Sequence, residues 1–167
     1  MIYLAFGSNL QSNLGTSKHI INKAYDELKK FGVRILRKSS FYKSKAFPNP
    51  RDPEFFNTVI LIHSKMHVKK LLEIILMIEI KLGRVRSNKN APRTIDIDII
   101  DFHSRNIKLL SKSINLTVPH DRLNKRLFVL GPLKEIRPNW KDPRTGTIIG
   151  FLIKKIEINR DNKITKI

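Results

Sequence analysis

Isoleucine and aspartate alternate in the segment APRTIDIDII, and this alternation is the strongest constraint on the fold. Side chains of a strand point to alternate faces, so Ile95, Ile97 and Ile99 share one face while Asp96 and Asp98 share the other. The two acids are roughly 6.6 Å apart along a strand, and at an effective dielectric constant near 20 they repel by about 2.5 kcal/mol. The segment therefore predicts an interior strand with a buried isoleucine face and an acidic face that needs positive charge nearby.

The acidic face has two explanations. It is either the solvated face of an edge strand or part of a site, because the loop before it carries Arg84, Arg86, Lys89 and Arg93. Carboxylates on one face can hold one or two Mg²⁺ ions that bridge phosphate oxygens, while guanidinium groups bind the remaining charge. The pattern favours a metal–polyphosphate site, and simple pairing of Arg84 and Arg93 with the acids is the alternative.

Length and composition limit the class of protein. The 167 residues predict one domain, 1–160, followed by a basic C-terminal tail, 161–167. The absence of cysteine excludes disulfides, thiolate zinc sites and cysteine nucleophiles. The first ten residues lack the features of a signal peptide or membrane span, so we expect a soluble cytoplasmic protein. The formal net charge of +19 suits a polyanionic ligand, although the basic residues are scattered.

Hydrophobic spacing predicts two helices between four strands. The helices are expected at 13–31 and 67–83, each ended by a glycine, and the strands at 2–6, 33–44, 54–64 and 95–100. This order of strand, helix, strand, strand, helix, strand is that of a ferredoxin-like α+β core. We also expect a hairpin partner of the aspartate strand at 106–110 and appended C-terminal helical elements, interrupted near Gly131 and Pro132. The whole would be a three-layer α/β/α arrangement.

Histidines and loops give weaker signals. No glycine-rich phosphate loop is present, so any nucleotide must be held by side chains. His63 and His67 lie four residues apart but lack the glutamate of a zinc protease. His120 lies near Arg122 and Arg126 and is either a surface histidine or a ligand contact.

Six segments together resemble one enzyme family. They are GSNL, SSFYKS, EFFNTV, GRVR, APRTIDIDII and TVPHDRLNKRLFVLGPLKEI, and in this order they resemble the 6-hydroxymethyl-7,8-dihydropterin pyrophosphokinase family of folate biosynthesis. The resemblance runs from residue 1 to about residue 155. It implies a ferredoxin-like, monomeric enzyme that transfers the β,γ-pyrophosphoryl group of ATP to the hydroxymethyl oxygen of a reduced pterin and releases AMP. It implies neither a nucleic-acid nor a membrane partner.

The resemblance also implies roles for individual residues. Asp96 and Asp98 match the ligands of two Mg²⁺ ions, and Arg84 and Arg93 match catalytic arginines. Implied ATP contacts are Arg86, Lys89, Ile99, Thr117, His120 and Arg126. Implied pterin contacts are Ser44, Ala46, Phe47, Phe55, Asn57, Asp96 and Phe128, of which Phe55 and Phe128 would sandwich the pterin and Asn57 would read its edge.

Two loops depart from the family's pattern. Lys89-Asn90-Ala91 stands where the family commonly has an arginine and an aromatic-glycine pair, and Asp52 replaces a customary glutamine before proline. Both loops, 45–53 and 84–92, are expected to act as lids. The alternative from another class is a ferredoxin-like RNA-binding module, but the sequence lacks its basic aromatic strand.

Overall fold

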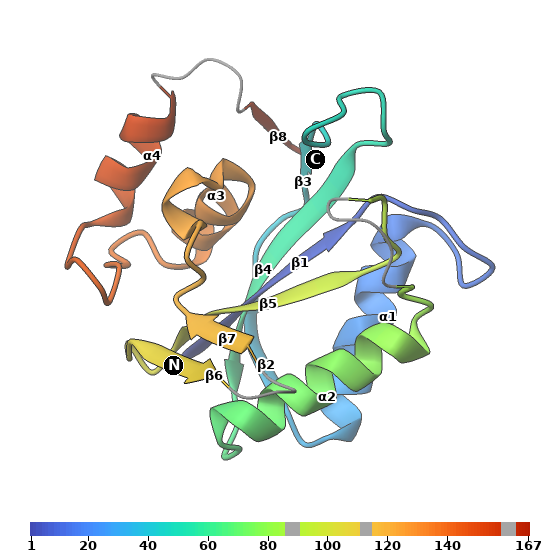
Figure 1. Ribbon diagram of the computed structural model, residues 1–167, viewed down its shortest axis with the longest axis horizontal. Coiled ribbons are helices and arrows are strands. Elements are labelled where there is room, and N and C mark those ends of the chain that lie inside the picture. Colours follow the sequence, from blue (N-terminus) through green and yellow to red (C-terminus); the bar gives the residue numbers. More distant parts are fainter. Residues whose placement is uncertain (86–90, 111–114, 158–162) are drawn as a thin grey trace.

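An antiparallel sheet with helices against both faces is the framework of the protein (Figure 1). The computed structural model describes residues 1–85, 91–110, 115–157 and 163–167. Its strands are β1 (Ile2–Ser8), β2 (Arg34–Lys38), β3 (Tyr42–Ser44), β4 (Phe55–His63), β5 (Asp96–Phe102), β6 (Ile107–Leu110), β7 (Asn115–Val118) and β8 (Ile164–Lys166). Its helices are α1 (Ser17–Lys30), α2 (Val68–Lys81), α3 (Leu127–Ile136) and α4 (Ile149–Glu157), with a 3₁₀ turn at Leu123–Lys125.

The sheet order places the aspartate strand at an edge. The sheet has six strands: five lie in the order β5-β1-β4-β3-β8, and the sixth, β2, pairs with β4. β1 lies between β5 and β4 and is antiparallel to both. The aspartate strand was expected in the interior of the sheet. It is an edge strand in hydrogen bonding, yet its isoleucine side chains are buried.

Each face of the sheet has its own hydrophobic core. Ile2, Leu4 and Phe6 of β1 pack with α1 and α2, whereas Tyr3 and Ala5 pack with α3 and α4. This alternation is what a strand buried on both faces requires. The sheet therefore lies between two helical layers, as expected, and Figure 1 shows α1 and α2 on one side and α3 and α4 on the other.

The two central helices confirm the sequence prediction. α1 and α2 fall within 13–31 and 67–83, and their apolar residues face the sheet. Gly32 and Gly83 follow the helix ends with φ of 76° and 80°. These left-handed conformations are the ones that glycine adopts without strain, so both residues terminate their helices as expected.

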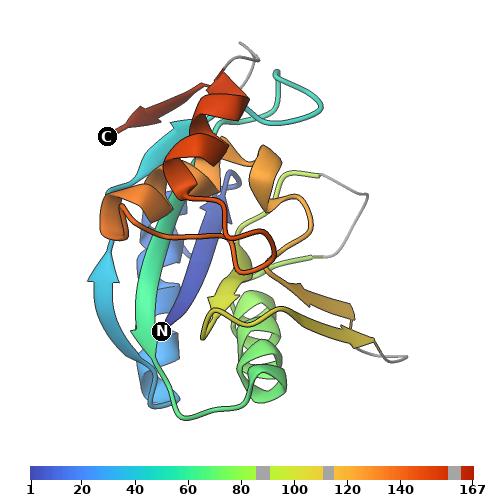
Figure 2. The same ribbon diagram turned by 90° about the vertical axis from the view of Figure 1, so that its left-hand side faces the viewer.

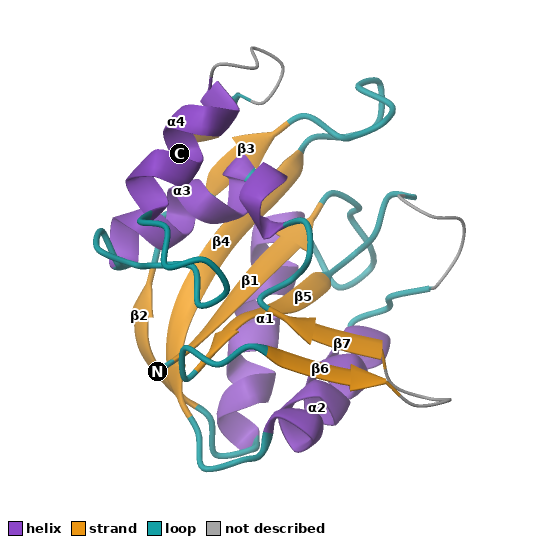
Figure 3. Cartoon of the chain, turned by 60° about the vertical axis from the view of Figure 1, so that its left-hand side comes forward, coloured by secondary structure: helices purple, strands orange, loops and turns teal. Residues whose placement is uncertain are grey.

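Two predicted strand arrangements are wrong. The segment 33–44 forms two strands, β2 and β3, because Ser39 leaves the regular ladder and its Oγ accepts a hydrogen bond from the Val59 N–H (3.0 Å). The segment near 106–110 forms β6 but pairs with β7 in a separate two-stranded sheet rather than with β5 (Figure 3). His103 and Ser104, with φ of 58° and 55°, turn the chain between β5 and β6.

The C-terminal part also differs from expectation. α3 runs through Gly131 and Pro132 without interruption, because burial of its aliphatic side chains outweighs the one hydrogen bond that proline cannot make. The predicted tail, 161–167, contains β8, which pairs with β3 at the edge of the sheet (Figure 2). None of the described helices has the length and apolar content needed to cross a bilayer.

Truncating α2 on its buried side should destabilise the fold. Ile75 is fully buried in the core beneath α2, so Ile75→Ala is expected to lower the free energy of unfolding by about 2–5 kcal/mol. Ile80, on the same helix, is 72% exposed, and Ile80→Ala should change the free energy of unfolding by no more than about 0.5 kcal/mol. Urea unfolding of both variants checks this, and equal effects would contradict the assigned face of α2.

Candidate active site

Three adjacent strands form the floor of a cavity that contains both aspartates. In the ladder, Asp96 of β5 lies opposite Gly7 of β1, and Gly7 lies opposite Asn57 of β4. Asp98 lies opposite Ala5 in the same way. Because Gly7 and Ala5 are small, the surface between the acids and Asn57 is left open. A cavity of about 660 Å³ lies over this floor.

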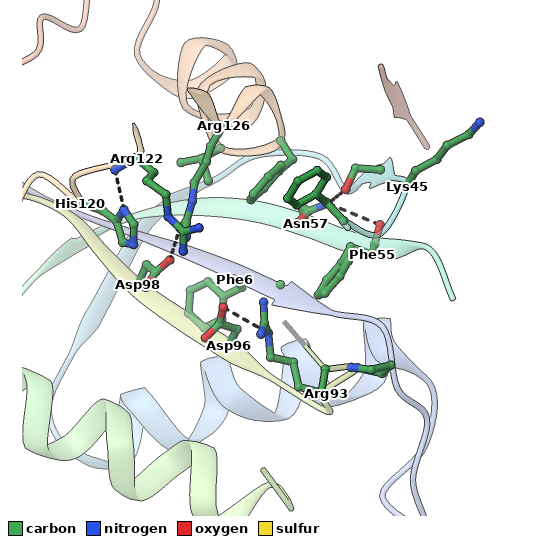
Figure 4. A pocket seen from close by; sticks show the side chains of 18 of the residues that line it. Phe6, Lys45, Phe55, Asn57, Arg93, Asp96, Asp98, His120, Arg122 and Arg126 are labelled. Carbon is green, nitrogen blue, oxygen red and sulfur yellow. Dashed lines mark hydrogen bonds and ion pairs between the residues drawn. The ribbon is translucent and has the colours of Figure 1, made fainter. Parts of the chain in front are cut away.

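Asp96 is bound by two arginines. Arg84 Nη1 lies 2.7 Å from Asp96 Oδ1. Arg93 Nε lies 3.3 Å from Asp96 Oδ2, and Figure 4 shows Arg93 beside Asp96. The Arg93 contact is an ion pair without hydrogen-bond geometry, since Nε has no hydrogen-bond partner among the described residues. The side chain of Asp96 is 23% exposed. The positive charge that the acidic face requires is therefore supplied, for this acid, from the loop before β5.

Asp98 is bound from a different direction. Arg126, at the start of α3, places Nη1 2.7 Å from Asp98 Oδ2. The sequence-based alternative assigned both acids to Arg84 and Arg93. In the structure, Arg84 and Arg93 both pair with Asp96, and Arg126 pairs with Asp98.

Glu79 is a buried carboxylate that contacts both Arg84 and the backbone of β5. It is 2% exposed, and its Oε1 accepts a hydrogen bond from the Ile97 N–H (2.7 Å) and a contact from Arg84 Nη1. Burial raises the pKa of Glu79 to about 7, although Arg84 and the Ile97 N–H oppose the shift. Glu79 thus connects α2 to the backbone between the two aspartates and to an arginine of the site.

Asn9 fixes the position of Arg93. Its Oδ1 accepts a hydrogen bond from the Arg93 N–H (2.8 Å), and its Nδ2 donates to the carbonyl of Pro53 (3.0 Å). The Asn9 N–H also donates to the Arg93 carbonyl (3.1 Å). One buried amide of the GSNL segment therefore holds the ends of two loops that border the cavity, the loop before β4 and the loop before β5.

Aromatic residues line another part of the cavity. Phe55 begins β4 and Phe128 lies in the first turn of α3, and both line the cavity. The guanidinium of Arg93 lies 5.3 Å from the centre of the Phe55 ring, and that of Arg126 lies 5.8 Å from the centre of the Phe128 ring. Asn57 Nδ2 donates to Ser44 Oγ (3.0 Å). The aromatic and charged parts of the cavity are therefore continuous.

His120 is held as a neutral hydrogen-bonding group. The Arg122 N–H donates to its Nδ1 (3.0 Å), so in the neutral ring the proton is on Nε2. Burial lowers the pKa of His120, and the nearby Asp98 carboxylate opposes this shift. Because His120 lines the cavity, its Nε2–H is available as a donor to a ligand such as a phosphate oxygen.

Most residues selected from the sequence meet at this cavity. Those that line it are Ser44, Phe47, Phe55, Asn57, Arg84, Arg93, Asp96, Asp98, His120, Arg126 and Phe128. Ala46 and Ile99 are buried and do not line it, and Thr117 lies on β7 opposite Lys108. Arg86 and Lys89 lie outside the described residues.

Other contributors were not selected from the sequence. Lys45 and Lys125 also line the cavity, and their positions in the sequence gave no signal. Arg122 lines it as well, and the sequence indicated it only as a neighbour of His120. Glu79 did give a signal in the sequence, since it lies four residues after Ile75 and eight after Leu71, on the core side of a predicted helix. A carboxylate there must have a buried partner.

The donor set suits a hard cation bound together with phosphate. The described residues contain no cluster of three or more side chains able to hold a metal ion. Mg²⁺, however, is usually bound by one or two carboxylates together with substrate phosphates and water. Asp96 and Asp98, on one face of β5 and in a cavity lined by several cations, fit that mode of binding.

Comparisons with known proteins agree on one family. Residues 3–138 match the family described as 7,8-dihydro-6-hydroxymethylpterin-pyrophosphokinase. The chain is 39% identical over 126 residues to the 2-amino-4-hydroxy-6-hydroxymethyldihydropteridine pyrophosphokinase of Synechocystis, covering 75% of this chain and 62% of that protein. The enzyme of the same name from Haemophilus influenzae is 33% identical over 165 residues, which cover 99% of this chain and 96% of that protein.

Longer relatives contain a similar region. The folic acid synthesis protein of Pneumocystis carinii is 35% identical over 93% of this chain, which spans 20% of that protein. Among solved structures, wild-type HPPK-DHPS of Plasmodium falciparum with pteroate superposes with a TM-score of 0.77 at 14% identity, over 99% of this chain and 47% of that one. The chain thus spans less than two thirds of several of the proteins that it resembles.

Replacing Glu79 should alter how stability depends on pH. Its pKa is about 7 in the folded protein against an ordinary 4.5, so its stabilising contribution is complete below about 4.5 and is lost as pH rises through 7. Glu79→Gln removes this dependence. Urea unfolding at pH 5 and pH 8 measures this. From pH 5 to pH 8, the free energy of unfolding of the wild type should fall relative to that of Glu79→Gln.

Glu73→Gln is the matched control, because Glu73 lies on the same helix with its side chain 48% exposed. The free energy of unfolding of Glu73→Gln should change between pH 5 and pH 8 by the same amount as that of the wild type. A constant difference between the wild type and Glu79→Gln would refute the raised pKa.

Proposed function

The chain belongs to the 7,8-dihydro-6-hydroxymethylpterin-pyrophosphokinase family, and from this premise we propose that it transfers pyrophosphate from ATP to 6-hydroxymethyl-7,8-dihydropterin. The products are AMP and (7,8-dihydropterin-6-yl)methyl diphosphate, and the reaction belongs to folate biosynthesis. One observation carries the proposal: a single cavity joins two carboxylates on one strand face to several cations and to an aromatic region.

The charged part of the cavity suits a triphosphate. Among the described residues, six basic side chains line the cavity: Lys45, Arg84, Arg93, Arg122, Lys125 and Arg126. Arginine binds phosphate oxygens bidentately, and the neutral His120 donates from Nε2. We propose that ATP binds here, with Arg86 and Lys89 as further contacts and with Ile99 and Thr117 contributing beside the cavity.

Asp96 and Asp98 are the proposed ligands of two Mg²⁺ ions. When bound, Mg²⁺ neutralises phosphate charge and polarises the phosphorus–oxygen bonds. In the structure these carboxylates pair instead with Arg84, Arg93 and Arg126. We propose that the arginines move from the carboxylates to phosphate oxygens when the nucleotide arrives, so that the acids become free to bind cations.

The aromatic part suits a flat heterocycle. Phe55 and Phe128 come from opposite elements, β4 and α3, and are proposed to stack on the two faces of the pterin. Asn57 and Ser44 supply hydrogen-bonding groups at the floor, where an amide can read the edge of the ring. Phe47 is 80% exposed at the start of the 45–53 loop and, with the backbone near Ala46, is proposed to cover the bound pterin.

The reaction needs positioning more than covalent help from the protein. The hydroxymethyl oxygen attacks the β-phosphorus of ATP and loses its proton to solvent, and the bond from that phosphorus to the oxygen bridging it to the α-phosphate breaks. Negative charge then shifts toward the leaving AMP. Arg84 and Arg93 are proposed to stabilise this charge, since Glu79 and Asn9 hold them beside the carboxylates.

The core of the fold is proposed to be the one that the family implies. We propose that it is the ferredoxin-like split β-α-β unit, which is supported by the sheet order β5-β1-β4-β3 and by two helices on one face. We propose a monomeric enzyme, because one chain supplies both parts of the cavity. We propose a cytoplasmic location, where ATP and Mg²⁺ are available.

The products of the reaction test the proposed chemistry. Protein incubated with Mg²⁺, ATP and 6-hydroxymethyl-7,8-dihydropterin should form AMP and the pterin diphosphate in equal amounts. Chromatography of the nucleotides and pterins measures both. Formation of ADP in place of AMP would show transfer of one phosphoryl group and would overturn the proposal.

Neutralising either aspartate should abolish turnover without loss of the fold. Asp96→Asn and Asp98→Asn keep the side-chain shape but remove the charge that a cation needs, so the rate is expected to fall at least about 100-fold. Asp26→Asn, on the exposed surface of α1, is the matched control and should keep the wild-type rate. Unchanged rates in Asp96→Asn or Asp98→Asn would remove that residue from the metal site.

A further inference from the structure

The C-terminal strand β8 lies beyond residues 3–138, which match the family, yet it contacts two elements of the cavity. These elements are β3, which ends at Ser44, and α3, which carries Phe128. Both residues are proposed pterin contacts, so any role of β8 in pterin binding rests on the proposed function. β8 itself does not line the cavity.

The first contact is a backbone ladder. Ile164 lies opposite Ser44 and Lys166 lies opposite Tyr42, and the Ile167 N–H donates to the carbonyl of Phe41 (3.0 Å). β3 has only three residues, and without β8 it would be an edge strand paired with β4 alone. β3 also leads directly into the 45–53 loop. β8 therefore restrains the side of the cavity on which Ser44 accepts its hydrogen bond from Asn57.

The second contact is close packing against α3. A Cβ added at Gly131 would collide with Cδ1 of Ile164, so the isoleucine occupies the space that the glycine leaves on the helix. One turn further on, Lys166 Nζ lies 3.1 Å from Glu135 Oε1. Since side chains alternate along a strand, Ile164 and Lys166 share the face toward α3, and Thr165 points away from it.

Glu135 extends this junction to the segment that begins β3. Its carboxylate accepts hydrogen bonds from the hydroxyls of Ser40 (2.8 Å) and Tyr42 (2.9 Å), in addition to the Lys166 contact. These hydroxyl and ammonium partners lower the pKa of Glu135, against the opposing effect of burial. α3, β3 and β8 thus meet in one junction.

We propose that β8 is a positioning element for the pterin. By filling the space at Gly131 and pairing with β3, it sets the separation between Phe128 on α3 and the Ser44–Asn57 pair on the sheet. In the charged part of the cavity, Arg84 and Arg93 are held by Glu79 and Asn9, whereas Arg126 at the start of α3 pairs with Asp98. β8 therefore controls mainly the affinity for the pterin, with a smaller effect on the affinity for ATP.

A pair of substitutions at the Gly131–Ile164 contact tests this proposal. Gly131→Ala displaces Ile164 and should raise the KM for the pterin about fivefold or more, with the KM for ATP within about twofold of the wild type. Adding Ile164→Val removes the colliding methyl group, so the double variant should recover a pterin KM within about twofold of the wild type. Such recovery is a coupling that independent effects do not produce. Thr165→Ala, on the opposite face of β8, is the control and should match the wild type.

General destabilisation is separated from positioning by the choice of variant. Alanine favours a helix over glycine, so Gly131→Ala should not weaken α3 itself. An unchanged pterin KM in Gly131→Ala, or a pterin KM and an ATP KM that rise together, would overturn the role of β8 while the wild-type reaction stands. Wild-type protein that forms no AMP would instead overturn the proposed function on which this role rests.

Discussion

Burial of the isoleucine face of β5 fixes the direction in which Asp96 and Asp98 point. Ile97 and Ile99 pack against α1 and α2, so the alternate residues must face the opposite side of the sheet. On that side the neighbouring strand offers Ala5 and Gly7, whose small side chains leave room for a cavity. A shift of β5 by one residue would bury both acids in the core, so packing and function require the same register.

Ion pairs keep the charged part of the cavity ready for a ligand. Two carboxylates so close together repel each other, and partly buried charges without partners are costly. Arg84, Arg93 and Arg126 satisfy the acids, while Glu79 and Asn9 hold the backbone and the first two arginines in place. A triphosphate with its cations can satisfy both groups at once, because each partner exchanges an ion pair for another of the same kind. The proposed binding would therefore leave these side chains paired.

Local sequence patterns predicted much of this architecture, but they did not predict which strands pair over long distances in the sequence. The alternation in β5 and the spacing of α1 and α2 predicted their positions and their buried faces. The pairing of β6 with β7, the break between β2 and β3 and the strand β8 depend on partners distant in the sequence, which no local period reveals. In the candidate site, the charged residues on and around β5 were predictable from their charges and from the resemblance to the enzyme family. Glu79 and Asn9 were not selected. The position of Glu79 on the core side of its helix indicates a buried partner, but the groups that these two residues contact depend on the fold.

We propose that the paired acids of β5 exchange arginines for metal ions when a nucleotide binds. A crystal structure with Mg²⁺ and a nonhydrolysable ATP analogue tests it most directly. We predict oxygens of Asp96 and Asp98 at about 2.0–2.1 Å from Mg²⁺, with Arg84 and Arg126 moved onto phosphate oxygens. A nucleotide bound elsewhere, with Asp96 and Asp98 still paired to their arginines, would contradict the claim.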